Sequence, residues 1–326
     1  MLAAAGPETL ILTSTESVRN AYTSGVPQEN NTNSFTPQAS IAIPRVNQVA
    51  FSSDGSCLVI AAEEGGGLAV YDVQGLQQGQ HEAAFQMPTN GVSVRVLAPN
   101  PAPEFSHLFA AVLANGQLVM ANLKDRQLVS GISGPVFREG VSCVSWSAKG
   151  KQLVAGLQDG TAAQYDHQGS EKARIPAPSL PPGQLPVTAI YWLTNDDFFT
   201  VHTPASGDNN DSIYHLIHRE KASGGFQTQK FANDPVPAFG TRFPPHQFIQ
   251  RLKGFPPNLD DMLVLSSTAG TDIGVFTRAT TSLAPDMAAE NTVNVYTTTS
   301  MADDSKRAQM PMSSDGMGDT SPIGMA

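Results

Sequence analysis

The apolar residues of this chain fall in short runs that are separated by glycine-containing turns. The clearest passage contains three such runs, at 141–146, 153–156 and 163–166, and a glycine stands in each of the two turns between them. Runs of this length bounded by turns are typical of β-strands, and glycine supplies the positive φ angle that tight hairpins need. The passage therefore predicts a unit of three strands joined by hairpins.

The same order of runs and turns recurs along the chain. Similar passages lie at 49–72, 94–122 and 187–217. The large apolar residues that end the first strand of each unit recur at steps of 46, 49 and 46 residues, and they are Phe51, Leu97, Trp146 and Trp192. Further strands are predicted at 10–12, 262–265, 272–276 and 293–296. The step is close to the ~40–45 residues of a four-stranded propeller blade.

This period predicts an all-β protein with the fold of a WD-repeat-like β-propeller. We expect about five recognisable blades plus partial ones, in a single incomplete propeller domain over residues 1–326. A four-stranded blade is apolar on both faces, so it is stable only when neighbouring blades pack against it. Tyr165-Asp166 stands where a WD repeat carries Trp-Asp, but the Gly-His element of many such repeats is absent. A β-sandwich with chance spacing is the alternative fold.

Several stretches between the predicted strands are rich in polar residues or proline. We expect loop insertions near 23–40, 202–212 and 222–258, and an interaction segment of helix and loop at 300–326. Ser300 to Asp303 resembles a capping box, which predicts a helix start there. Composition alone favours a solvated terminus for this last segment.

The charge balance and the cysteine count narrow the functional classes. The chain has 19 Lys and Arg against 29 Asp and Glu, for a net charge of −10, so it is a poor non-specific binder of nucleic acid. Two cysteines, Cys57 and Cys143, are too few for a disulfide framework or a zinc site. The sequence has neither an apolar run of membrane-spanning length nor the basic start of a signal peptide. We expect an intracellular protein without membrane insertion.

No motif for catalysis or for cofactor binding is present. The sequence lacks a nucleophile elbow, a phosphate-binding loop, a dinucleotide fingerprint and a His-Glu-x-x-His zinc motif. His202, His215 and His218 are close in sequence, but residues three apart on a strand point to opposite faces. We therefore expect no catalytic residues, no metal, no cofactor and no enzymatic activity. A propeller hydrolase is the alternative, and His202 or Asp211 would then carry the activity.

Four longer motifs carry a resemblance to a known family. They are Phe51–Gly55, Gly65–Asp72, Gly140–Trp146 and Ser267–Gly274. With them the chain resembles, over essentially its whole length, the N-terminal β-propeller of the fungal cytoplasmic-face nucleoporin, which is the counterpart of the vertebrate CAN nucleoporin. The resemblance implies a seven-bladed propeller at the cytoplasmic face of the nuclear pore complex, in the nuclear envelope. It also implies two kinds of partner, a DEAD-box RNA helicase of mRNA export and other nucleoporins of the cytoplasmic filaments.

The resemblance further implies the residues that bind the helicase. The family's motif is Ser-x-Arg-Ala, an apolar residue near a proline, an acidic stretch, and Ser-Pro followed by an apolar residue and glycine. Here Ser305–Met312 and Asp319–Gly324 match it. The partner-binding residues implied in this way are Arg307 as a charge contact, Met312 as the apolar anchor, and Asp315 and Asp319 as acidic contacts.

Two qualifications accompany that implication. Asp315 is the weaker match, because the spacing of the acidic stretch differs by one residue. The family's domain also has further strands before the position of Leu2 and most of a blade after that of Ala326, so we expect a propeller that is incomplete at both ends. A generic scaffold propeller that binds peptides on its top face is the alternative function.

Overall fold

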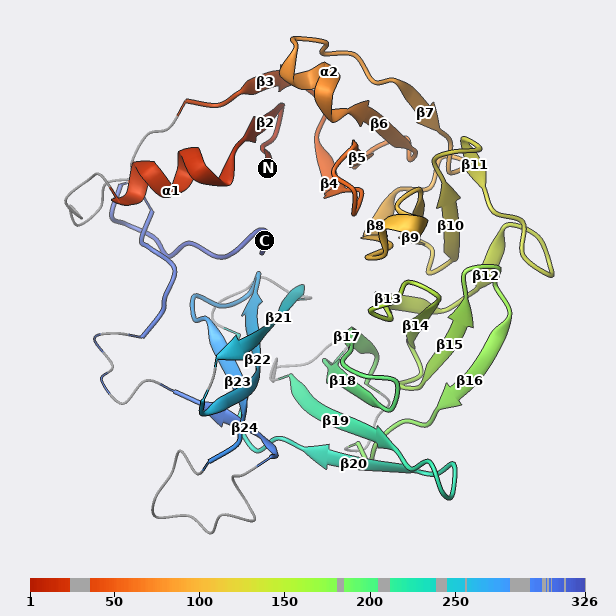
Figure 1. The fold of residues 1–326 in the computed structure, drawn as a ribbon, viewed down its shortest axis with the longest axis vertical. Helices are drawn as coiled ribbons and strands as arrows, with labels where there is room; N and C mark the ends of the chain where they lie inside the picture. Colours follow the sequence, from red (N-terminus) through yellow and green to blue (C-terminus); the bar gives the residue numbers. More distant parts are fainter. Residues whose placement is uncertain are drawn as a thin grey trace. The chain divides into compact units, whose positions relative to one another are not determined.

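Every passage that the hydrophobic pattern assigned to strands contains at least part of a β-strand in the computed structural model of the protein (Figure 1). The structure describes residues 1–23, 36–180, 185–204, 212–238, 245–255, 257–281, 294–300, 303, 305, 307–313 and 315–325. The strands of these residues form six sheets, and the strand pairs are antiparallel. The prediction of an all-β fold is confirmed.

The first three sheets come from the N-terminal part of the chain. The first contains β1 (Leu2–Ala5), β2 (Thr9–Thr13) and β3 (Ala39–Ala42), with helix α1 (Thr15–Thr23) after β2. The second contains β4 (Val46–Phe51), β5 (Cys57–Ala62), β6 (Leu68–Asp72) and β7 (Phe85–Met87), with the short helix α2 (Val73–Gln77) after β6. The third contains β8 (Val94–Pro99), β9 (Leu108–Leu113), β10 (Leu118–Asn122), β11 (Gln127–Leu128) and β12 (Val136–Arg138), with the 3-10 turn η1 (Pro103–Phe105) between β8 and β9.

The other three sheets have four strands each, paired in chain order. The fourth contains β13 (Val141–Trp146), β14 (Gln152–Leu157), β15 (Ala162–Asp166) and β16 (Glu171–Ile175). The fifth contains β17 (Val187–Trp192), β18 (Asp197–His202), β19 (Ile213–Arg219) and β20 (Phe226–Lys230). The sixth contains β21 (Gln247–Phe255), β22 (Leu259–Ser267), β23 (Gly274–Ala279) and β24 (Tyr296–Thr299).

The repeated sequence pattern reproduces a repeated strand register. Phe51 at the end of β4 pairs with Leu58 of β5, and Trp146 at the end of β13 pairs with Leu153 of β14. Because apolar residues occupy both faces of these strands, each sheet needs an apolar neighbour on either side. Val59 of the second sheet and Phe109 of the third, both fully buried, belong to one apolar cluster. Burial between neighbouring sheets is therefore what stabilises them.

The residue contacts divide the chain into two compact units. The first comprises 1–179 and 190–198, and the second comprises 180–189 and 199–326. Within the second unit the core is aromatic, with the rings of Phe231 and Phe276 centred 4.4 Å apart. The prediction of a single domain over 1–326 stays a prediction.

The predicted loop insertion over 222–258 is wrong for two of its stretches, because they form β20 and β21. Prolines on either side favoured the loop interpretation, but 247–255 contains none and pairs with β22 over its whole length. Of the other two predicted insertions, 24–35 and 205–211 lie outside the described residues. The part of the chain that the structure describes contains no helix that is long and apolar enough to cross a membrane.

Candidate partner-binding segment

The segment that follows β24 is held against the loop that precedes β23. The backbone N–H of Ile273 donates to the carbonyl of Ala308 (3.3 Å), and that of Met310 donates to the carbonyl of Thr271 (2.8 Å). These hydrogen bonds flank an antiparallel bridge between Asp272 and Gln309. A short backbone ladder therefore fixes the course of the chain at 308–310.

An ion pair reinforces this ladder. A guanidinium Nη2 of Arg307 donates to Oδ2 of Asp272 (2.7 Å), and Nε2 of Gln309 donates to Oδ1 of the same carboxylate (3.4 Å). The side chain of Arg307 is 41% exposed and that of Asp272 is 17% exposed. Pairs this close to the surface stabilise a fold by ~1 kcal/mol or less, so the contact orients Arg307 more than it stabilises the protein.

Beyond this anchor the chain turns back on itself in the terminal hairpin, which we define as residues 311–313 and 315–320. Met312 and Asp319 form an antiparallel bridge, and the N–H of Ser313 donates to the carbonyl of Gly318 (2.7 Å). Gly316 lies in the turn with a φ of +68°, a conformation that favours glycine. The hydroxyl of Ser313 accepts from the N–H of Gly318 (2.9 Å) and closes the loop. The hairpin is thus defined by its own hydrogen bonds.

The terminal hairpin and the residues after it expose apolar side chains beside carboxylates. Met312 is 54% exposed, Met317 is 89% exposed and Ile323 is 81% exposed. Residues paired across two antiparallel strands lie on the same face, so the Met312 side chain and the Asp319 carboxylate are neighbours. This arrangement is an apolar surface with an acidic border.

Asp315 is held in its charged form at the tip of the hairpin. Its Oδ1 accepts from the Ser313 hydroxyl (2.5 Å) and from the N–H of Met317 (3.0 Å). These two hydrogen bonds, the Ser313 contact first, hold the pKa of the carboxyl below its ordinary value. Asp315 therefore presents a fixed negative charge at neutral pH.

The structure brings three of the four sequence-predicted residues together. Met312, Asp315 and Asp319 share the terminal hairpin, whereas Arg307 lies in the preceding anchor and is already paired with Asp272. The predicted helix start at Ser300 falls largely outside the described residues. Asp303, which is described, accepts hydrogen bonds from the hydroxyl (2.6 Å) and the N–H (3.1 Å) of Ser305. The roles of the four residues stay predictions.

Sequence reasoning missed two residues of this region. Asp272, which orients Arg307, is part of the motif Ser267–Gly274, and Ile323 is the apolar residue of the Ser-Pro-Ile-Gly match. The two motifs that contain Asp272 and Ile323 are the signal in the sequence that could have identified them. Gly274 shows why that motif is constrained, because a Cβ there would lie 2.6 Å from the Cβ of Pro235.

The three histidines that a metal site or a hydrolase would need lie on two strands, β18 and β19. His215 is buried on β19 and His218 is exposed, as their spacing predicted. The rings of His202 and His215 are centred 5.3 Å apart in an edge-on arrangement, and His202 is fully buried. Burial, then the nearby His202 and Lys230, lowers the pKa of His215 to about 4. The described part of the chain contains no group of three or more potential metal ligands, and Asp211 lies outside it.

The sequence matches a family of known β-propellers. The family model described as "NUP159/214 beta propeller" matches residues 1–326. Nucleoporin NUP159 of Chaetomium thermophilum is 48% identical over 332 residues, which is 100% of this chain and 22% of that protein. Nucleoporin nup146 of Schizosaccharomyces pombe is 27% identical over 288 residues, covering 86% of this chain and 20% of that protein. The chain thus spans about a fifth of the length of these curated relatives.

Solved structures show the same fold. The crystal structure of the N-terminal domain of Nup159 has a TM-score of 0.71 at 18% identity, covering 99% of this chain and 78% of that one. A complex of S. cerevisiae dbp5 bound to nup159, gle1, IP6 and ADP contains a chain with a TM-score of 0.70 at 17% identity and the same two coverages. The chain belongs to the NUP159/214 β-propeller family.

Proposed function

We propose that this propeller is a docking platform for a DEAD-box RNA helicase at the cytoplasmic face of the nuclear pore complex, and that it serves mRNA export without enzymatic activity of its own. The observation that carries the proposal is the apolar surface of Met312, Met317 and Ile323 beside the carboxylates of Asp315 and Asp319. The relatives are nucleoporins, and the related Nup159 is recorded in complex with Dbp5. Other nucleoporins of the cytoplasmic filaments are the further partners.

The chemistry of the terminal hairpin suits a protein partner. Specific interfaces place apolar anchors at the centre and polar groups at the rim, and a few anchors carry most of the binding energy. Met312 is the anchor of this surface, because it is exposed and its backbone is fixed by the bridge to Asp319. Met317 and Ile323 extend the apolar area.

The acidic charges of the terminal hairpin favour a basic surface on the partner. Acidic groups on a chain of net charge −10 attract a basic surface and raise the association rate. A helicase carries such a surface where it holds RNA phosphates. Docking at Asp315 and Asp319 would occupy these positive groups, so helicase docking and RNA binding should compete. Arg307 would contact an acidic group of the partner with the guanidinium donors that Asp272 leaves free.

The proposal is tested by titrating the helicase into variants of this chain. Met312→Asp and Asp319→Arg should each weaken binding at least tenfold, because the first places a charge in the apolar centre and the second reverses a rim charge. Ile132→Asp and Glu82→Arg are matched controls, since Ile132 is an exposed apolar residue outside the terminal hairpin and Glu82 is an exposed acid elsewhere. The controls should bind like the wild type.

Salt and deletion sharpen the same test. The affinity should fall as salt rises, because exposed charges are screened beyond ~10 Å at 0.1 M ionic strength. Wild-type affinity in Met312→Asp would contradict the assignment of this site. Wild-type helicase affinity after deletion of residues 300–326 would support the alternative function, a scaffold propeller that binds peptides on another face.

A further inference from the structure

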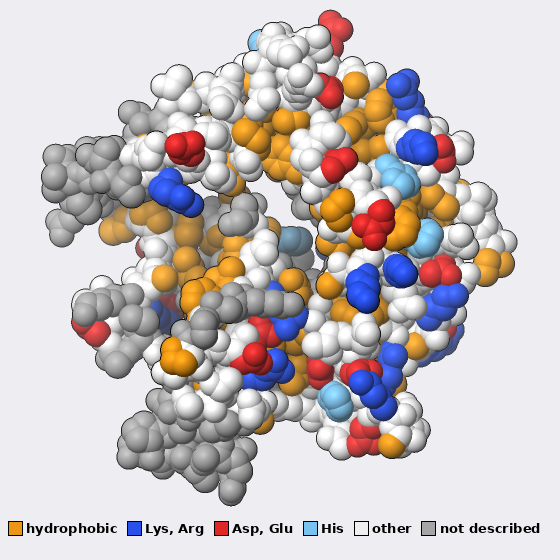
Figure 2. Space-filling model, in the orientation of Figure 1, with side chains coloured by type: hydrophobic (Ala, Val, Ile, Leu, Met, Phe, Trp, Pro, Cys, Tyr) orange, Lys and Arg blue, Asp and Glu red, His pale blue; other side chains and the backbone are white. Residues whose placement is uncertain are grey.

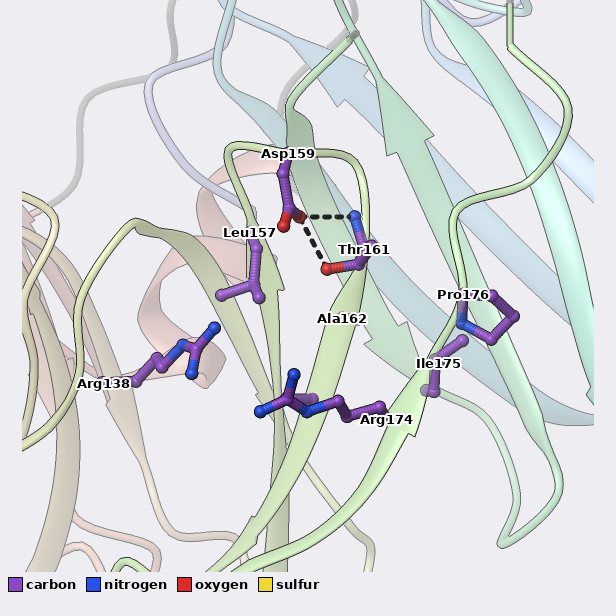
Figure 3. Close-up of a pocket in the computed structure, with 9 residues that line it drawn as sticks. Arg138, Leu157, Asp159, Thr161, Ala162, Arg174, Ile175 and Pro176 are labelled. Atoms are coloured by element: carbon purple, nitrogen blue, oxygen red, sulfur yellow. Dashed lines mark hydrogen bonds between the residues drawn. The ribbon is translucent and has the colours of Figure 1, made fainter.

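A second candidate site lies in the first compact unit, away from the terminal hairpin in sequence. A pocket of about 340 Å³ is lined by residues of β12 and of the sheet β13–β16 (Figure 3). Figure 2 shows Lys and Arg side chains gathered over this part of the molecule, mixed with acidic ones. The pocket therefore combines a concave shape with charged groups.

Two guanidiniums from different sheets point into this pocket. Arg138 comes from β12, which pairs with β10, and Arg174 comes from β16. Arg174 donates from Nε to Oε1 of Glu171 (2.6 Å), and its side chain is 70% exposed. Among the residues that the structure describes, the Arg138 guanidinium has no ion pair and no hydrogen bond. Its donors are available to a ligand.

The acidic groups near the pocket restrict the charge of that ligand. Oδ1 of Asp159 accepts from the N–H (2.9 Å) and the hydroxyl (2.6 Å) of Thr161. Burial opposes ionisation of Asp159, but the Thr161 hydrogen bonds and the charge of Arg138 outweigh it and hold the pKa of this carboxyl below its ordinary value. Arg138, Arg174 and Asp159 line the pocket, and Arg174 is paired with Glu171, so the formal charges of these four groups sum to zero. The site therefore has no surplus positive charge for a dianion, whereas a single carboxylate is matched by the Arg138 guanidinium.

The rest of the lining is apolar. Leu157 lines the pocket on one side of Ala162, Ile175 and Pro176 line it on the other, and Ala162 and Ala163 add small side chains (Figure 3). Such an apolar lining suits the aliphatic part of a peptide, while the planar guanidinium matches a carboxylate in two parallel hydrogen bonds. The pocket has both parts of a site for a carboxylate on an apolar stem.

We propose that this pocket binds a carboxylate of a peptide, with Arg138 as the main contact, Arg174 as the second and Leu157, Ile175 and Pro176 against the stem. The carboxylate belongs either to an acidic side chain or to a chain terminus, since the chemistry of the two is the same. This site uses none of the residues of the terminal hairpin, so its success or failure is independent of helicase docking.

The experiment is a titration followed by NMR at the arginine Nε–H groups of the whole chain. The probes are acetyl-Leu-Glu-Leu-amide, its glutamine counterpart, acetyl-Leu-Leu with a free terminus, and inorganic phosphate. Arg138→Gln removes the main contact, Arg138→Lys keeps the charge without the planar fork, and Arg45→Gln is the control, because Arg45 is an exposed surface arginine paired with Glu63. Thermal unfolding of each variant establishes that it is folded.

We expect the glutamate peptide or the free terminus to shift the Arg138 signal saturably, and the glutamine peptide not to. Arg138→Gln should weaken that binding at least tenfold, Arg138→Lys should weaken it less, and Arg45→Gln should leave it unchanged. Binding of the amidated glutamate peptide alone identifies a side chain as the source, and binding of acetyl-Leu-Leu alone identifies a terminus. Equal binding by Arg138→Gln, no response to either carboxylate, or a response to phosphate only would overturn the proposal.

Discussion

The sheet β13–β16 and the terminal segment at 307–325 are held together in opposite ways. In the sheet, strand β14 has a buried core residue at nearly every position, and Leu153 is fully buried. In the segment, Met312, Met317 and Ile323 are exposed, and the chain is held by an ion pair, a short ladder and turn hydrogen bonds. The sheet is stabilised by apolar burial, whereas the segment is positioned by polar contacts and leaves its apolar groups exposed.

This difference separates stability from function in the chain. Burial of apolar area contributes most of the free energy of folding, while exposed apolar groups contribute little to it. A substitution in the sheets should therefore change the free energy of unfolding. A substitution in the segment should change binding and leave the fold intact.

The largest effect is expected where a charge is buried within a sheet. Asp261 on β22 is 1% exposed and pairs with Arg251, and its carboxylate also accepts from the Tyr296 hydroxyl (2.5 Å). Asp261→Ala should lower the free energy of unfolding by ~3–5 kcal/mol, because it removes the buried carboxylate that pairs with Arg251 and accepts from the Tyr296 hydroxyl. Urea denaturation measures this loss. Asp260→Ala removes the neighbouring, exposed partner of Arg278 and should cost ~1 kcal/mol or less.

A direct comparison of the two regions comes from two truncations. Leu153→Ala in β14 should lower the free energy of unfolding by ~2–5 kcal/mol, through lost burial and a residual cavity. Met312→Ala in the terminal hairpin should change it by less than ~0.5 kcal/mol, because the side chain is already exposed. Denaturant unfolding of both variants measures the contrast. A large loss in Met312→Ala would show that the segment is part of the core.

Acid should destabilise the fold through His215. Its pKa of about 4 in the folded protein lies below the value of 6.5 for an unperturbed histidine, so between these pH values the unfolded state binds more protons. The stabilisation is complete above pH 6.5 and decreases as the pH falls, by about 3 kcal/mol at pH 4. Unfolding of wild type and His215→Gln across this range measures the difference. His218→Gln, on the opposite face of β19, should keep the wild-type profile.

A small effect on stability is expected at the anchor of the segment. Asp272→Asn weakens the contact with Arg307 and should lower the free energy of unfolding by ~0.2–1 kcal/mol. The free energy of helicase binding should fall by more than the free energy of unfolding does, because Arg307 loses its orientation. A double-mutant cycle with Arg307→Gln separates the pairwise contribution. Additive losses in the cycle would show that the pair does not orient the segment.

The sequence predicts the sheets better than it predicts the segment, and the reason is physical. Strands such as β5 and β14 carry continuous apolar runs, so their existence and register follow from burial. Strand β21 was missed because prolines flank it and its sequence mixes polar with apolar residues. It is fixed by pairing with β22, a contact between distant residues that a local pattern does not contain.

The segment illustrates the same limit more strongly. Arg307, Met312, Asp315 and Asp319 could be singled out only through a family resemblance, because four residues without periodicity carry no structural signal. The pairing of Arg307 with Asp272 joins residues 35 positions apart and could not be inferred from either motif. In the same way, the sequence does not indicate that Arg138 and Arg174 line one pocket, because this depends on how β12 and β16 are placed in the fold.

We propose that the sheets carry the fold and that the terminal segment carries the docking function. Hydrogen–deuterium exchange of the chain with and without the helicase distinguishes these two roles. We predict that the helicase slows exchange at amides of 307–320 and leaves those of β13–β16 unchanged. Protection confined to the sheets, with exchange at 307–320 unaltered, would contradict the account.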